Sequence, residues 1–318
     1  MKLTTATLLL AGLVLAPACR TTTARATGAA EPTPASATAR AREAAAASPT
    51  APAPAARPAA AAREGLYDRP GFATFAVDGR IWVFRDGSAE LAAFRAGAEP
   101  SKSVTRPGAG PAGRTLRATD ADKLLEYMTA RPGFRTLVRD GRVWIFAEGA
   151  PELADFLAGA EPAKHVTFPG AGPAGITLKT IDRDTLLAWS AARPGFVTAI
   201  VDGRVWVFRP GTEELAEFER YGEPAKHVTR PGVGPRGATV KAPDGETLTE
   251  FVVARDGFET LRVDGRLWVF ETGSEALAAF RAHGEPAAHV TLVGVGPLGL
   301  TLKGPDRDTL DRYQRSQT

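Results

Sequence analysis

The chain has 318 residues, of which 44% are hydrophobic and 24% are charged, which is a globular composition. Its net charge of +3 comes from the N-terminal part: residues 1–63 hold seven basic and two acidic residues, which leaves residues 64–318 at −2. This balance removes the usual electrostatic argument for nucleic acid as a partner, so we expect none.

Residues 1–18 have the layout of a secretory signal peptide. Met1 and Lys2 precede the apolar run LTTATLLLAGLVLA, which is too short to span a bilayer core. The run ends in the small-residue stretch APAC at Cys19, and the chain has no second cysteine with which a disulfide could form. We therefore expect the protein to leave the cytoplasm.

The stretch that ends at Cys19 resembles a bacterial lipoprotein signal, in which this cysteine becomes the lipidated first residue of the mature chain. A lipobox usually has Leu three residues before the cysteine, whereas Ala16 takes that place here and Leu15 lies one position earlier. The resemblance implies a lipid anchor in the bacterial cell envelope, facing the periplasm or the exterior, and Arg20 favours the outer membrane. The tripeptide APA also fits ordinary signal cleavage, which would release a soluble secreted protein.

Residues 19–64 are expected to be the lipidated cysteine followed by a tether. From residue 20 to residue 63 the composition is mostly Ala, Pro, Thr and Arg, with almost no large apolar side chain. Such a segment cannot bury enough surface to offset the entropy of ordering it. The sequence therefore predicts a disordered linker between the anchor and the folded part.

The remainder is a repeat array with a period of 62 residues. This spacing is exact for Phe72, Phe134, Phe196 and Phe258. It is also exact for Trp82, Trp144, Trp206 and Trp268. Self-similarity of this kind indicates tandem modules. We place their boundaries at residues 65–130, 131–192, 193–254 and 255–318.

Within a copy the elements follow in the order β-β-α-β-β-α. In the third copy, residues 195–201 and 204–208 predict two strands joined by an Asp-Gly turn, since both turn positions need positive φ. A helix over about 213–221 follows a capping Thr212, and residues 222–229 lead into a third strand. The Gly-rich stretch PGVGPRG leads into a fourth strand, residues 238–241, and Asp244 caps a second helix. The corresponding N-cap candidates elsewhere are Ser88, Ser274, Asp120, Asp182 and Asp306.

The fold class predicted is α+β, with four tandem ββαββα repeats. This order is what a ferredoxin-like fold becomes when it is circularly permuted. Each repeat would then be a four-stranded antiparallel sheet with strand order 1-2-4-3, two helices on one face and right-handed crossovers.

The candidate binding residues lie on the face of each sheet that carries the tryptophan. Pairing across the Asp-Gly turn places Ala199 opposite Trp206, and the matching positions of other copies include Arg135 and Glu259, which argues against a helix-covered core there. Aromatic rings beside hydroxyls and amines suit sugar rings or extended peptides. The candidates are Trp82, Phe84, Trp144, Phe146, Trp206, Phe208, Trp268, Phe270, Lys179, Lys241, Lys303, His165, His227 and His289.

Two functions follow from this face. One is a membrane-anchored repeat protein that binds an extended partner, such as cell-wall glycan, polysaccharide or protein, with the avidity that repeated sites provide. The other is a structural spacer or assembly lipoprotein whose Trp faces are buried between modules, the more common role of a mid-strand tryptophan. Both explain the repetition.

Other motifs predict no cofactor, no metal site and no enzyme. The G-x-G-x-x-G stretches, such as GVGPRG, are followed by a strand and contain Pro, so we expect hairpin loops and not dinucleotide sites. Each of the copies two to four has one histidine at a shared position, where the first has Ser103, so no module has a ligand set of its own. The Asp-x-Asp pairs, such as Asp182 and Asp184, fit helix capping, with calcium binding as the alternative. No nucleophile constellation stands out.

Overall fold

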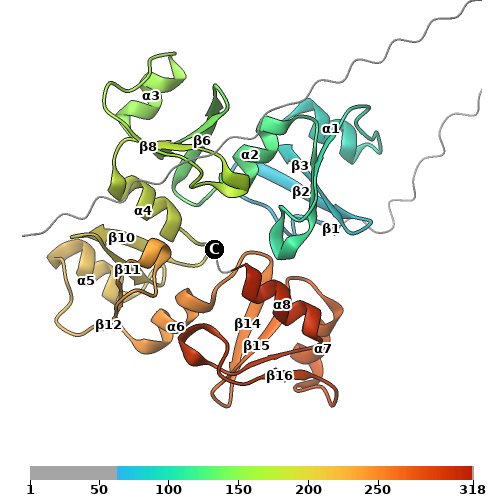
Figure 1. Ribbon diagram of the computed structural model, residues 1–318, viewed down its shortest axis with the longest axis vertical. Helices are drawn as coiled ribbons and strands as arrows, with labels where there is room; N and C mark the ends of the chain where they lie inside the picture. The colour runs from blue at the N-terminus through green and yellow to red at the C-terminus, as the bar shows by residue number, and fades with distance from the viewer. Residues whose placement is uncertain (1–62, 317–318) are drawn as a thin grey trace, which may run out of the picture. The chain divides into compact units, whose positions relative to one another are not determined.

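The computed structural model describes residues 63–316 (Figure 1). The predicted signal peptide, Cys19 and nearly all of the predicted tether lie outside the described residues. Among the described residues, no helix is both long enough and apolar enough to cross a membrane.

Four sheets repeat along the chain, one for each predicted copy, here called modules 1 to 4. In module 1 the order β2-β3-β5-β4 matches the predicted 1-2-4-3, and the other modules repeat it. The first strands are β2 (Phe72–Val77), β6 (Phe134–Arg139), β10 (Val197–Val201) and β14 (Phe258–Val263). The second strands are β3 (Arg80–Arg85), β7 (Arg142–Ala147), β11 (Arg204–Phe208) and β15 (Arg266–Glu271).

The second half of each module adds two short strands. The third strands are β4 (Val104–Arg106), β8 (Val166–Phe168), β12 (Val228–Arg230) and β16 (Val290–Leu292). The fourth strands are β5 (Thr115–Ala118), β9 (Leu178–Thr180), β13 (Val240–Ala242) and β17 (Leu302–Gly304). Module 1 has an additional edge strand, β1 (Arg63–Glu64), which pairs with β2.

Turn and cap chemistry set the element boundaries as the sequence predicts. Asp202 and Gly203 have φ of 51° and 68°, which gives the expected type I′ hairpin and the predicted pairing of Ala199 with Trp206. The first helices are α1 (Ala89–Arg95), α3 (Pro151–Leu157), α5 (Glu213–Tyr221) and α7 (Glu275–His283). The second helices are α2 (Ala121–Thr129), α4 (Arg183–Ala191), α6 (Gly245–Val253) and α8 (Arg307–Arg315). Asp244 accepts from the amide of Thr247, and the other predicted Asp, Ser and Thr caps do the same in their helices.

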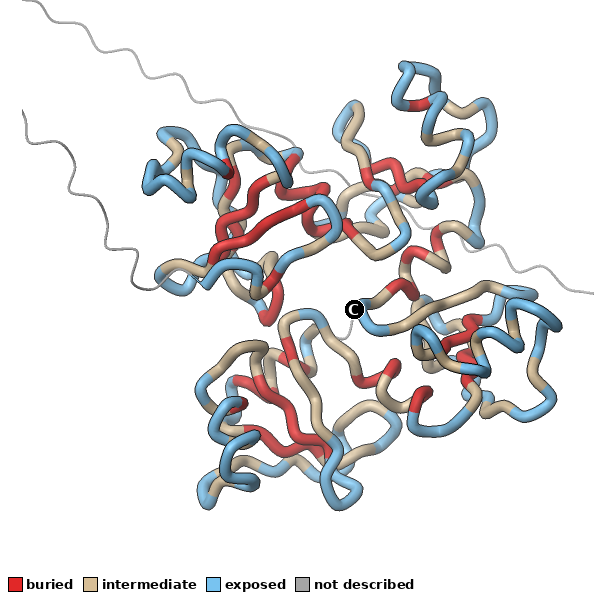
Figure 2. The backbone as a smooth tube through the Cα atoms, turned by 180° about the vertical axis from the view of Figure 1, so that it is seen from behind, coloured by how far each residue is buried: buried red, intermediate tan, exposed pale blue. Residues whose placement is uncertain are grey.

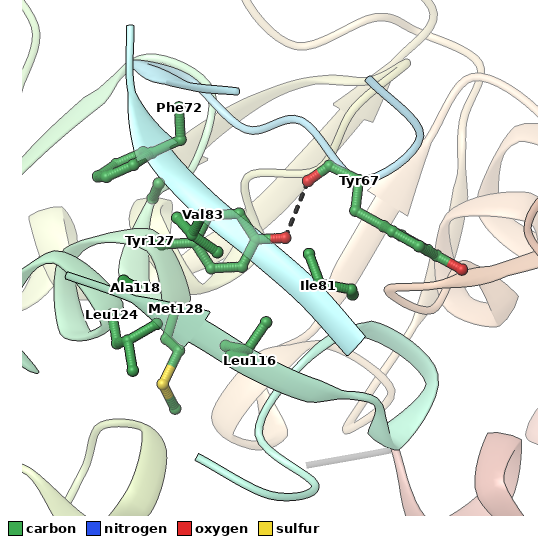
Figure 3. Close-up of a cluster of buried hydrophobic side chains, with 10 residues drawn as sticks. Tyr67, Phe72, Ile81, Val83, Leu116, Ala118, Leu124, Tyr127 and Met128 are labelled. Carbon is green, nitrogen blue, oxygen red and sulfur yellow. Dashed lines mark hydrogen bonds between the residues drawn. The ribbon is translucent and has the colours of Figure 1, made fainter. Parts of the chain in front are cut away.

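The two helices of a module lie on opposite faces of its sheet, so the prediction of both on one face is wrong. Along β3, Trp82 points to one face and Ile81 and Val83 to the other, because side chains alternate along a strand. Phe94 of α1 packs against Trp82, with ring centroids 5.5 Å apart. Tyr127 of α2 packs in the core that contains Ile81 and Val83 (Figure 3). Figure 2 shows the buried stretch that results along the central strands.

The central pair of strands is parallel, which corrects the antiparallel sheet and the ferredoxin-like crossover. Trp206 of β11 pairs in parallel with Lys241 of β13, and the other modules agree. The third strand is antiparallel to the fourth and therefore also to the second. It starts from the end of the sheet where the second strand finished.

The second helix of each module also contacts the module that follows. Helix α2 packs against β6 and the short helix η2 (Pro173–Gly175), α4 against η3 (Pro235–Gly237), and α6 against η4 (Pro297–Gly299). Helix α8 in turn contacts η1 (Pro111–Gly113) of module 1. The order of contacts is therefore 1-2-3-4-1, a closed cycle.

The contact between modules 4 and 1 contains polar pairs that join residues far apart in sequence. The amide of Ala112 donates to the carbonyl of Asp256 over 3.3 Å, and Arg114 donates to Glu271 over 2.7 Å. The Tyr67 hydroxyl lies 3.5 Å from the carbonyl of Thr272. Since no peptide bond joins these two modules, such contacts are what hold them together.

In modules 1, 2 and 4, an aromatic side chain of the second helix donates a hydrogen bond to a backbone carbonyl 60 residues earlier in the chain. Tyr127 donates to the carbonyl of Tyr67 and Tyr313 to that of Val253, both over 2.8 Å, and the indole of Trp189 donates to Thr129 over 2.8 Å. Phe251 takes the same place in module 3 and has no donor. Figure 3 shows the first of these bonds.

Tyr313 is expected to make a destabilising contribution at alkaline pH. Burial raises the pKa of this hydroxyl from 10.0 to about 12, so the unfolded chain loses the proton first and stability falls as pH rises from 10 to 12. The loss should reach about 2 kcal/mol, and Tyr313→Phe should remove that part of the pH dependence. Urea unfolding at intervals between pH 8 and 12 measures it. Equal slopes in the two proteins would contradict the assignment.

Candidate functional site

The predicted aromatic residues form a buried cluster inside each module. The tryptophans Trp82, Trp144, Trp206 and Trp268 are each 1% exposed, and their partners Phe84, Phe146, Phe208 and Phe270 are 0% exposed. In module 3, Trp206 stacks on Phe208 at 6.0 Å, and Phe218 of α5 covers Trp206 at 5.4 Å. The prediction of an exposed aromatic face is therefore wrong, and so is burial between modules, since the covering helix belongs to the same module.

Charged side chains near this face led to the wrong expectation. Arg139 is at the edge strand of module 2, where its guanidinium lies 3.5 Å from the ring centroid of Phe156 and donates to that residue's carbonyl. Glu259 in module 4 pairs with Arg281 of the covering helix. These long side chains cross the end of the helix and keep their charges near water, so they do not require an open face.

The predicted lysines and histidines cover the tryptophan from its other side. In module 2, the Lys179 ammonium lies 4.4 Å from the ring centroid of Trp144, and the His165 ring is steeply tilted to the indole, with ring centroids 5.1 Å apart. His165 Nδ1 is 3.2 Å from the carbonyl of Pro162, and a carbonyl can only accept, so Nδ1 is the donor. The same arrangement recurs in modules 3 and 4, with the cation–π pairs Lys241–Trp206 and Lys303–Trp268 and the histidines His227 and His289.

In each module a glutamate accepts a hydrogen bond from the lysine or arginine that lies over the tryptophan. Lys179 donates to Glu161 over 2.7 Å, and this hydrogen bond is the main reason that the pKa of Glu161 lies below its usual value. Hydrogen bonds from Lys241 and Lys303 lower the pKa of Glu223 and Glu285 in the same way. In module 1, Arg117 replaces the lysine, lies 4.1 Å from the Trp82 ring centroid and donates to Ser103, which replaces the histidine. Each predicted cation is thus held against a ring.

The glycine-rich stretches form the loops that the sequence predicts. In each module the stretch makes one 3₁₀ turn and is followed by a strand. The residue before its last glycine has positive φ, as Arg236 does at 57°. No helix N-terminus follows to bind a dinucleotide phosphate. Within residues 63–316, no three His, Cys, Asp or Glu side chains gather so that they could hold a metal ion.

Four arginines that the sequence analysis did not select come together instead. Arg69, Arg131, Arg193 and Arg255, here called the arginine quartet, occupy one repeat position just before the first strand of each module. Each lies within 6 Å of the aromatic ring that the second helix of its module contributes. The signal was available in the sequence, since the motif R-P-G-F recurs three times and becomes R-D-G-F in the fourth copy.

The predicted site therefore divides into two parts. The Trp, Phe, Lys and His residues belong to the interior of single modules, whereas the arginine quartet draws one residue from every module. Searches of protein-family models, of curated proteins and of solved structures find no significant match to this chain.

Proposed function

We propose that this protein is a lipid-anchored scaffold of the bacterial cell envelope, whose four modules act as one structural body that spaces or assembles partner proteins. The observation that carries the proposal is how the repeated motif is used: each of the four strand tryptophans is packed beneath a helix of its own module. The repeated Trp motif therefore forms the interior of each module, and the closed cycle of contacts joins the four modules.

The competing function is a binding platform for cell-wall glycan or another polysaccharide. Stacking on sugar rings needs aromatic faces that reach solvent. The rings in question are 0–1% exposed, and the lysines beside them are already paired with glutamates. These facts favour the scaffold over the platform.

Limited proteolysis of the full chain tests whether the modules act as one body. We expect early cleavage outside residues 63–316 and then a resistant fragment that holds all four modules. Stable fragments of about one repeat each would mean independent modules and would contradict the scaffold proposal. Iodide quenching of tryptophan emission provides a second readout, because a platform predicts ready quenching and a scaffold predicts resistance.

The anchor rests on the resemblance around Cys19, and one substitution tests it. In a Gram-negative host, Cys19→Ala should move the protein from the membrane fraction to the soluble fraction and abolish incorporation of labelled palmitate, because the lipidated thiol is lost. A control such as Thr22→Ala should change neither. Membrane association that survives Cys19→Ala would contradict the lipid anchor.

A further inference from the structure

The arginine quartet gathers at the C-terminal ends of two helices. Arg69 and Arg131 both donate to the carbonyl of Met128 at the end of α2, over 3.0 and 3.4 Å. Arg193 and Arg255 both donate to the carbonyl of Ala254 just after α6, over 3.2 and 2.8 Å. Two pairs of like charges are therefore each drawn to one oxygen atom.

The two pairs belong to one cluster. Asp256, which follows Arg255 in the chain, forms an ion pair with Arg69 across the contact between modules 4 and 1. Burial first, and then the charges of Arg255 and Arg131, lower the pKa of Arg193 to about 10. Burial and the charge of Arg69 lower the pKa of Arg131 to about 10 as well. The charges thus act along the series from Arg69 through Arg131 and Arg193 to Arg255.

The cluster has more positive charge than its surroundings balance. Among residues 63–316, Asp256 is the one acid that forms an ion pair with the quartet. The two helix ends add the equivalent of about half a negative charge each, which leaves roughly two positive charges uncompensated. In addition, Nε of Arg255 is buried and has no hydrogen-bond partner within the described residues.

The missing counter-charge should be an anion that several guanidinium groups can bind at once. Guanidinium forks match the spacing of oxygens on phosphate-type groups, and such bonds are among the strongest hydrogen bonds in proteins. A halide offers no such geometry. The donors come from all four modules, so a bound oxyanion would also hold the cycle closed.

We propose that the arginine quartet binds one free tetrahedral oxyanion of the phosphate class, either inorganic phosphate or a small phosphomonoester. It contacts guanidinium donors that the helix carbonyls leave unused, including Nε of Arg255. Asp256 occupies one side of the cluster and competes with the anion for Arg69. This site is separate from the Trp clusters and does not depend on the scaffold proposal.

Calorimetric titration of the full chain in detergent with inorganic phosphate tests the site, with chloride at equal ionic strength as the reference. We expect one saturable site and a raised melting temperature. Arg131→Gln and Arg193→Gln should weaken phosphate binding by about 10- to 100-fold, since each removes charged donors. Asp256→Asn should strengthen it, because the competing acid is lost. Arg183→Gln, an exposed position on α4, is the matched control and should leave the affinity unchanged.

Near-ultraviolet circular dichroism checks that each variant keeps its fold, and Asp256→Asn keeps the test informative if a glutamine variant unfolds. Absence of saturable phosphate binding in the unmodified chain would overturn the proposal. So would affinities that are equal in the unmodified chain and in Arg131→Gln. Phosphatidylglycerol vesicles form the last arm: binding to vesicles without binding to free phosphate would assign the site to a lipid headgroup and would overturn a free anion.

Discussion

Trp206→Ala is expected to lower the free energy of unfolding by about 3–5 kcal/mol, as is typical when a buried aromatic side chain is removed. Trp206 is 1% exposed and contacts Phe208, Phe218 and His227, with ring centroids 5.1–6.0 Å apart. Its removal leaves a cavity between the sheet and α5 and deprives Lys241 of the ring it lies against. Chemical denaturation followed by circular dichroism measures the loss.

Tyr221→Ala in the same module is the matched control. Tyr221 ends α5 and is 75% exposed, so its loss should cost less than about 0.5 kcal/mol. A scaffold predicts a large effect of Trp206→Ala on stability. If stability were unchanged while binding to isolated cell walls was lost, the tryptophan would be a ligand contact and the platform function would replace the scaffold.

Local chemistry explains why much of a module could be predicted from the sequence. The Asp-Gly turn fixes the hairpin, and the hairpin fixes which residue faces Trp206. The side chain of Asp244 caps its helix through an amide three residues further along the chain. Each of these features depends on neighbours in sequence, and four nearly identical copies repeat the same signal.

The covering of the faces depends on longer-range geometry, and there the prediction failed. Arg135 and Glu259 share the face of the tryptophans but are on edge strands, where a long side chain can pass the covering helix. The residue composition of a sheet face therefore says little about whether a helix packs on that face. Strand direction was missed for a similar reason, since it depends on the end of the sheet at which the chain re-enters after the first helix.

The closing contact between modules 4 and 1 depends on a charge exchange in the sequence of module 4, whose role becomes clear only from the structure. Arg85 pairs with Glu126 in module 1 and Arg209 with Glu250 in module 3. In module 4 the charges are exchanged, and Glu271 pairs with Arg312. The exchange lets Glu271 also bind Arg114 of module 1, over 2.7 Å, which an arginine at that position could not do.

Gly257→Ala is expected to open the contact between modules 4 and 1. Gly257 has φ of +79°, and a Cβ there would lie 2.3 Å from the amide nitrogen of Ala112 and 2.6 Å from the carbonyl carbon of Pro111. Both are backbone atoms, so they cannot relieve the clash by a change of side-chain rotamer. The left-handed conformation costs an alanine about 1–2 kcal/mol, and the clash adds roughly 1–3 kcal/mol or separates the modules.

Gly133→Ala separates these two costs. Gly133 has the same place in module 2 and a φ of +76°, but a Cβ there would meet nothing within 4 Å. Its substitution should cost the backbone strain alone, so the difference between the two variants measures the closing contact. Amide hydrogen exchange at Ala112 gives the local readout, because its N–H donates to Asp256 over 3.3 Å. Exchange there should become faster in Gly257→Ala and remain unchanged in Gly133→Ala. Equal stability and equal exchange in both variants would mean that modules 4 and 1 do not touch in solution, and the arginine quartet would then lack the contact that brings its two pairs together.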